Sequence, residues 1–443
     1  LGLVGSEMCI RDSTTSAHFY LLIAMKLFGT DGIRGQINHY PMVAELALKL
    51  GQGLASLLPR ATTQAPRVVI GRDTRSSGPM LEQALVSGLL SCGCDVVLVG
   101  VLPTPAVAFA TLHHQCSAGI MLTASHNPAE DNGIKIFAAD GYKLSDAQEA
   151  ELEAFLLDPT AQPALASSTA IGRIHASNDT AAAYLAHLRH AVPELNLRGQ
   201  RVVVDCGHGA ASALAQPLLE SLGAEVILLN AAPNGLNINE DCGAMHPEHA
   251  AASLTRRQAS LGVCLDGDAD RAIFIDETGS VVSGDRIIAL CALDAQQRHA
   301  LAHDTVVVTV MSNAGLHAAM RQAGIRSIST AVGDRHVLET MRAGGYVIGG
   351  ENSGHLIFSE HATTGDGLLA TLMVLAVQQR RQQSLACLAD CMEEYPACLL
   401  SFAVRAKPAL EKLDAFQRTS AAAAAALGAV SYTHLRAHET EAD

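Results

Sequence analysis

The chain has 443 residues, of which 49% are hydrophobic and 17% are charged, and this composition excludes an intrinsically disordered protein. At roughly 150 residues per domain, the length predicts about three domains. The formal net charge of −14 and the absence of tryptophan argue against a surface for nucleic acid or for an anionic membrane. We therefore expect no nucleic acid and no membrane as partners, and any phosphate group must be bound by a local set of cations.

Cysteine usage and the length of the apolar runs predict a cytoplasmic protein. The eleven cysteines form no Cys-x-x-Cys pair, which is typical of buried thiols in a reducing compartment. Cys92 and Cys94 could bind a metal or form a redox pair, but their position between a helix and a strand favours buried thiols. No apolar run approaches the roughly 18 residues of a membrane-spanning helix.

The two ends of the chain differ from the rest. Residues 1–13 and 431–443 share no periodicity with their neighbours and resemble translated sequencing adapters. We expect residues 1–24 to be a non-native or upstream segment, with Met25 as the natural start. Residues 431–443 are expected to be an adapter-like tail, so that the natural C-terminus is missing.

Between these ends, short apolar strands alternate with longer amphipathic stretches, which is typical of parallel strands joined by crossover helices. In chain order, strands are predicted at 68–73, 95–100, 118–124, 201–210, 224–230, 261–268, 305–310, 326–330 and 346–350, and helices at 80–90, 104–112, 211–222, 314–323 and 334–343. Three α/β units in series explain this pattern. A strand at 399–406 and a helix at 408–427 would begin a further unit.

The loop after the strand at 118–124 carries Ser125, and loops at the carboxyl ends of parallel strands are where ligands bind. A serine exposed there can act as a nucleophile or carry a phosphate, and the adjacent His126 or the nearby Lys135 can manage its proton. The alternative is a serine that caps a helix, followed by a proline of an ordinary turn. The loop by itself does not decide between them.

An acidic loop, DGDADR, follows the strand that leads to Asp266. Asp266, Asp268 and Asp270 can converge on one hard cation, and Gly267 allows a tight turn. A solvated acidic turn is one alternative, and an EF-hand loop is another, although Arg271 stands where that loop requires glycine. Magnesium at a phosphoryl-transfer site is favoured, with Arg271 as a cation beside the same phosphate.

Three weaker loops complete the set. Glu351, Asn352 and Ser353, between glycines, suit recognition of sugar hydroxyls, although a glycine-rich turn is the alternative. Near the start, FGTDGIRG places Arg34 where it can bind a phosphate. Arg335 follows another strand, and its alternative is a surface ion pair.

Together, FGTDGIRG, TASHNP, DGDADR and GENSGH, in this order, resemble the α-D-phosphohexomutase superfamily and, within it, the phosphoglucosamine mutase family. The resemblance covers residues 25 to about 428. It implies a phosphorylated Ser125 and one Mg²⁺ per active site, held by Ser125, Asp266, Asp268 and Asp270. It also implies catalytic roles for Ser125, His126, Lys135 and Arg34, with Lys135 as an acid/base candidate, and substrate binding by Glu351, Asn352, Ser353, His355, Arg271 and Arg335.

The resemblance also implies a fold: three consecutive α/β/α mixed-sheet domains of similar topology, plus an incomplete fourth α+β domain. We expect domain I at residues 25–160 with the phosphoserine loop and domain II at 161–277 with the metal loop. Domain III is expected at 278–393 with the sugar-binding loop, and a fragment of domain IV at 394–430.

The activity implied is the interconversion of glucosamine 6-phosphate and glucosamine 1-phosphate through a bisphosphate intermediate. The alternatives are a phosphoglucomutase or phosphomannomutase, a metal-dependent phosphatase, or a non-catalytic sugar-phosphate binder. A homodimer is expected from the family alone. The family's fourth-domain Ser-Gly-Thr loop, which holds the non-reacting phosphate, is absent from the sequence. Because that loop orients the substrate, we expect reduced turnover.

Overall fold

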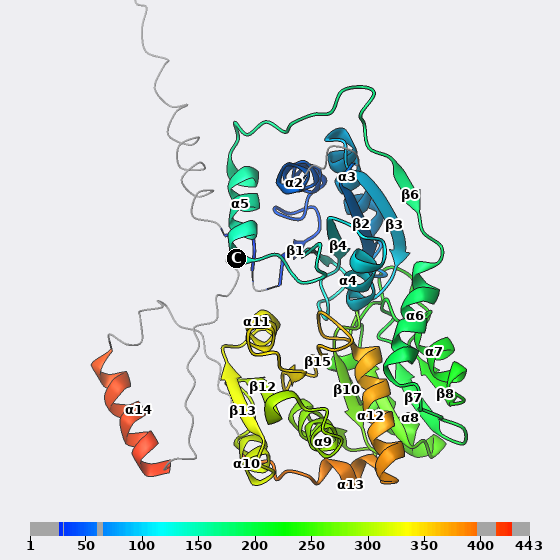
Figure 1. The fold of residues 1–443 in the computed structure, drawn as a ribbon, viewed down its shortest axis with the longest axis vertical. Helices are drawn as coiled ribbons and strands as arrows, with labels where there is room; N and C mark the ends of the chain where they lie inside the picture. Colours follow the sequence, from blue (N-terminus) through cyan, green and yellow to red (C-terminus); the bar gives the residue numbers. More distant parts are fainter. Residues whose placement is uncertain (1–25, 30, 60–64, 397–412, 428–443) are drawn as a thin grey trace, which may run out of the picture.

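Three mixed β-sheets with helices packed around them make up the chain in this computed structural model (Figure 1). The structure describes residues 26–29, 31–59, 65–396 and 413–427. In Figure 1 the first sheet lies in the upper half, and the second and third sheets lie below it. The predicted fold class of three α/β/α domains is confirmed. Within the described residues, no helix is both long enough and apolar enough to cross a membrane.

The first sheet has the strand order β1-β5-β4-β2-β3-β6, with β2, β3, β4 and β6 parallel and β5 antiparallel to both of its neighbours. Its elements are β1 (Ile33–Gln36), α2 (Ala44–Leu57), β2 (Arg67–Arg72), α3 (Gly78–Ser91), β3 (Asp95–Val101), α4 (Thr104–His113), β4 (Ala118–Leu122), β5 (Asp131–Ala138), α5 (Asp146–Leu157) and β6 (Ile174–Ala176). Strand β6 extends this sheet past residue 160, where we expected the first domain to end.

The second sheet has the order β11-β10-β9-β7-β8, in which β7, β8 and β9 are parallel and β10 and β11 form an antiparallel edge. Its elements are α6 (Thr180–Ala191), β7 (Arg201–Asp205), α7 (Ala215–Ser221), β8 (Glu225–Leu229), a 3₁₀ turn (Gly243–Met245), α8 (Glu248–Arg257), β9 (Leu261–Leu265), β10 (Ala272–Ile275) and β11 (Val281–Val282). Fully buried β9 leads directly into the acidic loop.

The third sheet has the order β13-β12-β14-β15, with β15 as its antiparallel edge. Its elements are α9 (Gly284–Gln297), a 3₁₀ turn (Ala302–Asp304), β12 (Thr305–Thr309), α10 (Ala314–Gln322), β13 (Arg326–Thr330), α11 (Asp334–Gly344), β14 (Ile348–Gly350), β15 (Leu356–Phe358), α12 (Gly367–Arg381) and α13 (Leu385–Ala389). Of the expected fourth unit, only α14 (Asp414–Leu427) is described, and the strand expected at 399–406 lies outside the described residues.

Three predicted strands end earlier than expected, and the residues beyond them form the candidate loops. The predictions 118–124, 201–210 and 261–268 are wrong at their ends, since the strands stop at Leu122, Asp205 and Leu265. Each following loop contains a residue with positive φ, which a strand cannot continue through: Ser125 at 52°, Gly207 at 54° and Ala269 at 55°. Apolar patterning alone therefore overestimated these strands.

One continuous hydrophobic core joins the three domains. It contains Ala106 of α4, Tyr184 of α6, Leu265 of β9 and Leu369 of α12, which come from all three of them. A second core, between α2, α3, α5 and the other face of the first sheet, belongs to the first domain alone. Because packed interiors resist deformation, the shared core fixes where the strand-end loops of the three domains lie relative to one another.

The crossing of α2 and α3 yields a first prediction. A Cβ added at Gly88 would lie 2.2 Å from the carbonyl oxygen of Leu48, which neither backbone can avoid without moving. Gly88→Ala should therefore destabilise the protein by about 1–3 kcal/mol, outweighing the roughly 1 kcal/mol that alanine gains over glycine in a helix. Ser87→Ala, exposed on the same helix, is the control and should leave the thermal unfolding midpoint unchanged or slightly higher. A Gly88→Ala protein as stable as the parent would contradict this.

Candidate active site

Ser125 lies at the start of the loop after β4, with its side chain buried and its hydroxyl directed at the acidic loop. Its Oγ donates a hydrogen bond to Asp266 Oδ2 at 2.7 Å and lies 3.3 Å from His126 Nδ1. The backbone of Ser125 has φ of 52°, a left-handed conformation that costs energy for a residue other than glycine. The loop is thus held in a strained turn that places one hydroxyl against one carboxylate.

Arg75, which the sequence analysis did not select, holds this turn in place. Its guanidinium is fully buried and donates hydrogen bonds to four backbone carbonyls of the loop, those of Ser125, Asn127, Pro128 and Asp131. Asp73 pairs with the same guanidinium at 2.9 Å and also accepts a hydrogen bond from Thr123. The sequence feature that could have identified Arg75 is the polar run GRDTRSSG, which follows strand β2. This run lies at the same edge of the sheet as Ser125.

Two residues of the second domain also contact the loop that carries Ser125, which we term the serine loop. Asn239 donates from Nδ2 to the carbonyl of Ser125 at 2.8 Å and to that of Asn127 at 3.0 Å. A Cβ at Gly267 would lie 2.6 Å from the carbonyl oxygen of Ser125, so only glycine allows the two loops to approach this closely. The acidic loop of the second domain therefore packs directly on the serine loop of the first.

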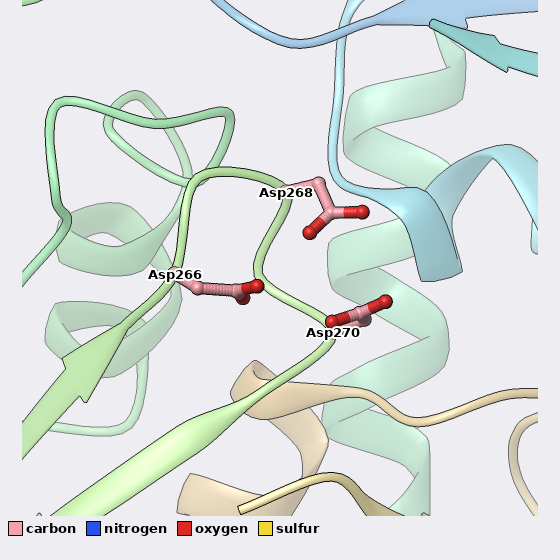
Figure 2. Close-up of side chains that lie close together, drawn as sticks. All are labelled: Asp266, Asp268 and Asp270. Atoms are coloured by element: carbon pink, nitrogen blue, oxygen red, sulfur yellow. The ribbon is translucent and has the colours of Figure 1, made fainter. Parts of the chain in front are cut away.

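The three predicted aspartates come together on the tight loop after β9 (Figure 2). Asp266, Asp268 and Asp270 are buried, and each offers an oxygen within 4.8 Å of the others. Oδ1 of Asp268 and Oδ1 of Asp270 are buried and have no hydrogen-bond partner among the described residues. Unpaired carboxylate oxygens this close together need a cation, and oxygen ligands suit Mg²⁺ or Ca²⁺. The residues present therefore fit the predicted metal site.

The pKa values of the cluster show the same shortage of positive charge. Burial, together with the carboxylates of Asp270 and Asp268, raises the pKa of Asp266 well above its ordinary value. Burial would also raise the pKa of Asp270, but the Lys135 ammonium holds it well below the usual range. Asp270 thus has Lys135 as its counter-ion, whereas Asp266 has no ion-pair partner among the described residues. A bound cation would provide a counter-ion for Asp266.

Lys135 lies on strand β5 rather than in the loop, and this places its ammonium among three carboxylates. Nζ is 2.8 Å from Asp268 Oδ2, 2.9 Å from Asp270 Oδ2 and 3.0 Å from Asp31 Oδ2. Burial alone would lower the pKa of Lys135, but these carboxylates raise it well above the ordinary value. In this arrangement Lys135 is therefore charged and is suited to neutralising a phosphate, whereas its raised pKa disfavours the transfer of its proton.

His126, Arg34 and Arg271 supply the remaining polar groups beside Ser125. Burial and the charges of Arg271 and Arg34 lower the pKa of His126 to about 4, so its imidazole is neutral at pH 7. Arg34 pairs with Asp31. The Nε atoms of Arg34 and Arg271 are buried without a hydrogen-bond partner among the described residues, which leaves both cations with unused donors.

The predicted sugar loop follows β14, and its polar residues are half-buried Glu351, exposed Asn352 and Ser353, and buried His355. Asn352 and Ser353 are exposed, and Glu351 Oε1 accepts a hydrogen bond from the backbone N–H of Gly333 at 3.0 Å. His355 is buried, with Nδ1 3.7 Å from Asp270 Oδ1, so the end of this loop meets the aspartate cluster. Burial would lower the pKa of Arg271, but the carboxylates of Asp270, Asp266 and Glu351 raise it, so Glu351 of this loop also acts on that cation.

Arg335, predicted to bind substrate, instead pairs with the first domain. Its guanidinium forms ion pairs with Glu149 and Asp146, both at the start of α5. In this structure Arg335 forms ion pairs, as the alternative interpretation expected. The pairs join the third domain to the first rather than two residues on the surface of one domain. The physical reason is that Glu149 is largely buried, with its side chain 10% exposed, and needs a cation.

The carbonyl clamp formed by Arg75 yields a second prediction. Arg75→Met would leave Asp73 buried without its cation and four loop carbonyls without a donor, which should destabilise the protein by about 3–5 kcal/mol. Amide hydrogen exchange in residues 123–131 should accelerate more than exchange in β4. Arg67→Met, at an exposed arginine that donates to the His114 carbonyl, is the control and should change neither measurement. Unchanged exchange in the serine loop of the Arg75 variant would show that the clamp has no role.

Comparison with protein families agrees with the three-domain architecture. Residues 25–162 match the model for phosphoglucomutase/phosphomannomutase alpha/beta/alpha domain I, residues 182–279 match domain II and residues 283–395 match domain III. Among solved structures, a phosphoglucomutase/phosphomannomutase family protein from Burkholderia thailandensis superimposes with a TM-score of 0.72. It has 29% sequence identity, and the match covers 82% of this chain and 79% of that one.

Curated relatives define the family more narrowly. A phosphoglucosamine mutase from Anaeromyxobacter dehalogenans is 49% identical over 428 residues, which cover 95% of this chain and 93% of the relative. A phosphoglucosamine mutase from Rhodococcus erythropolis is 48% identical, with 94% of this chain and 93% of the relative covered. Similarity of this level over nearly the whole of each chain, on a site of this geometry, leads to one conclusion. The chain belongs to the phosphoglucosamine mutase family of the phosphohexomutases.

Proposed function

We propose that this protein interconverts glucosamine 6-phosphate and glucosamine 1-phosphate, with Ser125 carrying the transferred phosphoryl group. The observation that carries the proposal is the position of the Ser125 hydroxyl, 2.7 Å from Asp266 and beside two carboxylate oxygens that have no hydrogen-bond partner among the described residues. The names of the relatives supply the substrate class. A serine held in a strained turn against a cation site suits phosphoryl transfer, in which positioning and charge neutralisation do most of the work.

The reaction balances without any further reactant. In the first half, the bond between phosphorus and Ser125 Oγ breaks and a bond forms to the 1-oxygen of glucosamine 6-phosphate. The proton of the 1-hydroxyl ends on Ser125 Oγ. The resulting bisphosphate then turns end over end, and its 6-phosphate returns to Ser125 while the serine proton passes to the 6-oxygen. The product is glucosamine 1-phosphate, and Ser125 is phosphorylated again.

The other residues bind and orient the substrate in this proposal. Asp266, Asp268, Asp270 and the seryl phosphate would hold one Mg²⁺, which when bound neutralises charge on the phosphate. Lys135 places its ammonium at the same cluster, and Arg34 and Arg271 have unused donors that suit phosphate oxygens. Glu351, Asn352 and Ser353 offer oxygen and amide groups for the sugar hydroxyls. His126, neutral at pH 7 and 3.3 Å from Ser125 Oγ, is placed to accept a hydrogen bond.

The central test removes the phosphoryl carrier. Ser125→Ala should lower conversion of glucosamine 6-phosphate by at least about 10³-fold, as expected when the nucleophile is lost. Ser87→Ala, exposed on α3, is the control and should keep parental activity. Intact-mass analysis after incubation with glucose 1,6-bisphosphate should show one added phosphate on the parent and none on the Ser125 variant. Equal turnover of glucose or mannose phosphates by the parent would instead favour a phosphoglucomutase or phosphomannomutase.

The metal site has a test that does not depend on turnover. Asp268→Asn replaces a charged oxygen of the cluster by an amide, and we expect Mn²⁺, used as a spectroscopic probe, to bind at least about tenfold more weakly. Asp241→Asn, at an exposed aspartate of the second domain, is the control and should leave Mn²⁺ affinity unchanged. Equal Mn²⁺ affinity in the parent and the Asp268 variant would mean that the cluster is not the metal site.

A further inference from the structure

Lys143, in the turn between β5 and α5, joins two domains through buried charges. Its Nζ forms ion pairs with Asp31, just before β1, and with Asp334, the first residue of α11 in the third domain. The lysine side chain is only 7% exposed. Burial would lower the pKa of Lys143, but Asp31 and Asp334 raise it, so the side chain carries its charge.

Both partners of Lys143 also contact groups of the site. Asp31 Oδ2 lies 3.0 Å from Lys135 Nζ, and Asp334 Oδ2 lies 3.4 Å from Nε2 of His355, at the end of the sugar loop. Lys135 and His355 in turn both meet Asp270, at 2.9 Å and 3.7 Å. The contacts therefore close into a ring of alternating acidic and basic side chains, which we term the charge ring. In order, its members are Asp270, Lys135, Asp31, Lys143, Asp334 and His355.

The charge ring takes members from all three domains. Lys135, Asp31 and Lys143 come from the first, Asp270 from the second, and Asp334 and His355 from the third. Other ion pairs across the same boundary do not reach the aspartate cluster. Arg342 pairs with Asp140 and lies over the ring of Tyr142, 3.8 Å from its centroid, and both of its contacts are at the surface. Arg342 therefore provides a matched comparison, since it joins the same two segments without touching the site.

We propose that Lys143 is a positioning residue for the reaction: through Asp31 it sets where the Lys135 ammonium lies, and through Asp334 it aligns the sugar-loop end of the third domain with the aspartate cluster. The proposal rests on the proposed function for its kinetic part only. Without Lys143, Asp31 loses one of its cations and attracts Lys135 more strongly. Lys135 then moves away from Asp268 and Asp270, whose oxygens it shares with the predicted metal.

The test compares four forms of the full-length chain: the parent, Lys143→Met, Lys143→Arg and Arg342→Met. For Lys143→Met we expect kcat with glucosamine 6-phosphate to fall by about 10²-fold, as for a small misplacement of reacting groups. Lys143→Arg, which keeps the charge, should recover at least a tenth of the parental kcat. Arg342→Met should keep kcat within threefold of the parent, and because its ion pair is exposed it should lose less thermal stability than Lys143→Met.

A second measurement uses Mn²⁺ alone, titrated against each protein by electron paramagnetic resonance. Because Lys135 competes with the cation for Asp268 and Asp270, Lys143→Met should bind Mn²⁺ about tenfold more tightly, and Arg342→Met should bind it as the parent does. If the parent shows no mutase turnover, the proposed function fails and the Mn²⁺ titration alone decides the role of Lys143. If Lys143→Met does not fold, the double variant Lys143→Met, Asp334→Asn is measured instead. The second substitution removes the buried charge of Asp334 that would otherwise lack a cation.

The proposal is overturned if Mn²⁺ affinity in the decisive variant stays within twofold of the parent. It is also overturned if the loss of kcat in Lys143→Met is no greater than that in Arg342→Met. A structural role alone would lower the stability of Lys143→Met and leave its Mn²⁺ affinity unchanged. Tighter Mn²⁺ binding confined to the Lys143 variants, with kcat restored by arginine, supports the positioning role.

Discussion

Compensation of buried negative charge is the constraint on which the rest of this structure depends. Asp266, Asp268 and Asp270 lie on one short loop, shielded from water, and carboxylates this close together repel one another strongly unless cations are supplied. Lys135 neutralises part of the cluster, and two carboxylate oxygens remain without hydrogen-bond partners among the described residues. Further positive charge would therefore stabilise the arrangement, which is the property that a site for a metal ion and a phosphate needs.

This constraint explains why the site is assembled from separate domains. A single strand-end loop cannot bring enough cations to three carboxylates, so Lys135 is supplied by the first sheet and His355 by the third. The shared core between α4, α6 and α12 keeps these contributors together. Glycines are needed where backbones meet, as at Gly267, whose Cβ would collide with the Ser125 carbonyl. Close backbone packing and charge compensation therefore both stabilise the contacts between the loops that form the site.

The structure also separates arginines that hold the fold from those left for a ligand. Arg75 donates to the serine loop and to Asp73, and both terminal nitrogens of Arg335 donate to α5, although its Nε has no hydrogen-bond partner among the described residues. Arg34 and Arg271 keep buried donors without partners among the described residues. All four lie in or near a strand in the sequence, which by itself does not distinguish their roles. Their roles differ because only the folded chain determines which acceptors each guanidinium reaches.

The sequence by itself determined the three α/β units, the serine loop, the acidic loop and the sugar loop, because apolar periodicity and short motifs are local properties of the chain. It extended three strands beyond Leu122, Asp205 and Leu265, where the chain turns into loops that contain left-handed residues. Only the tertiary structure determined which groups three cations contact. Arg75 donates to the carbonyls of the serine loop, Arg335 pairs with Glu149, and Lys143 pairs with Asp334. These contacts join residues far apart in the chain, and their energies depend on burial and distance, which no local pattern encodes.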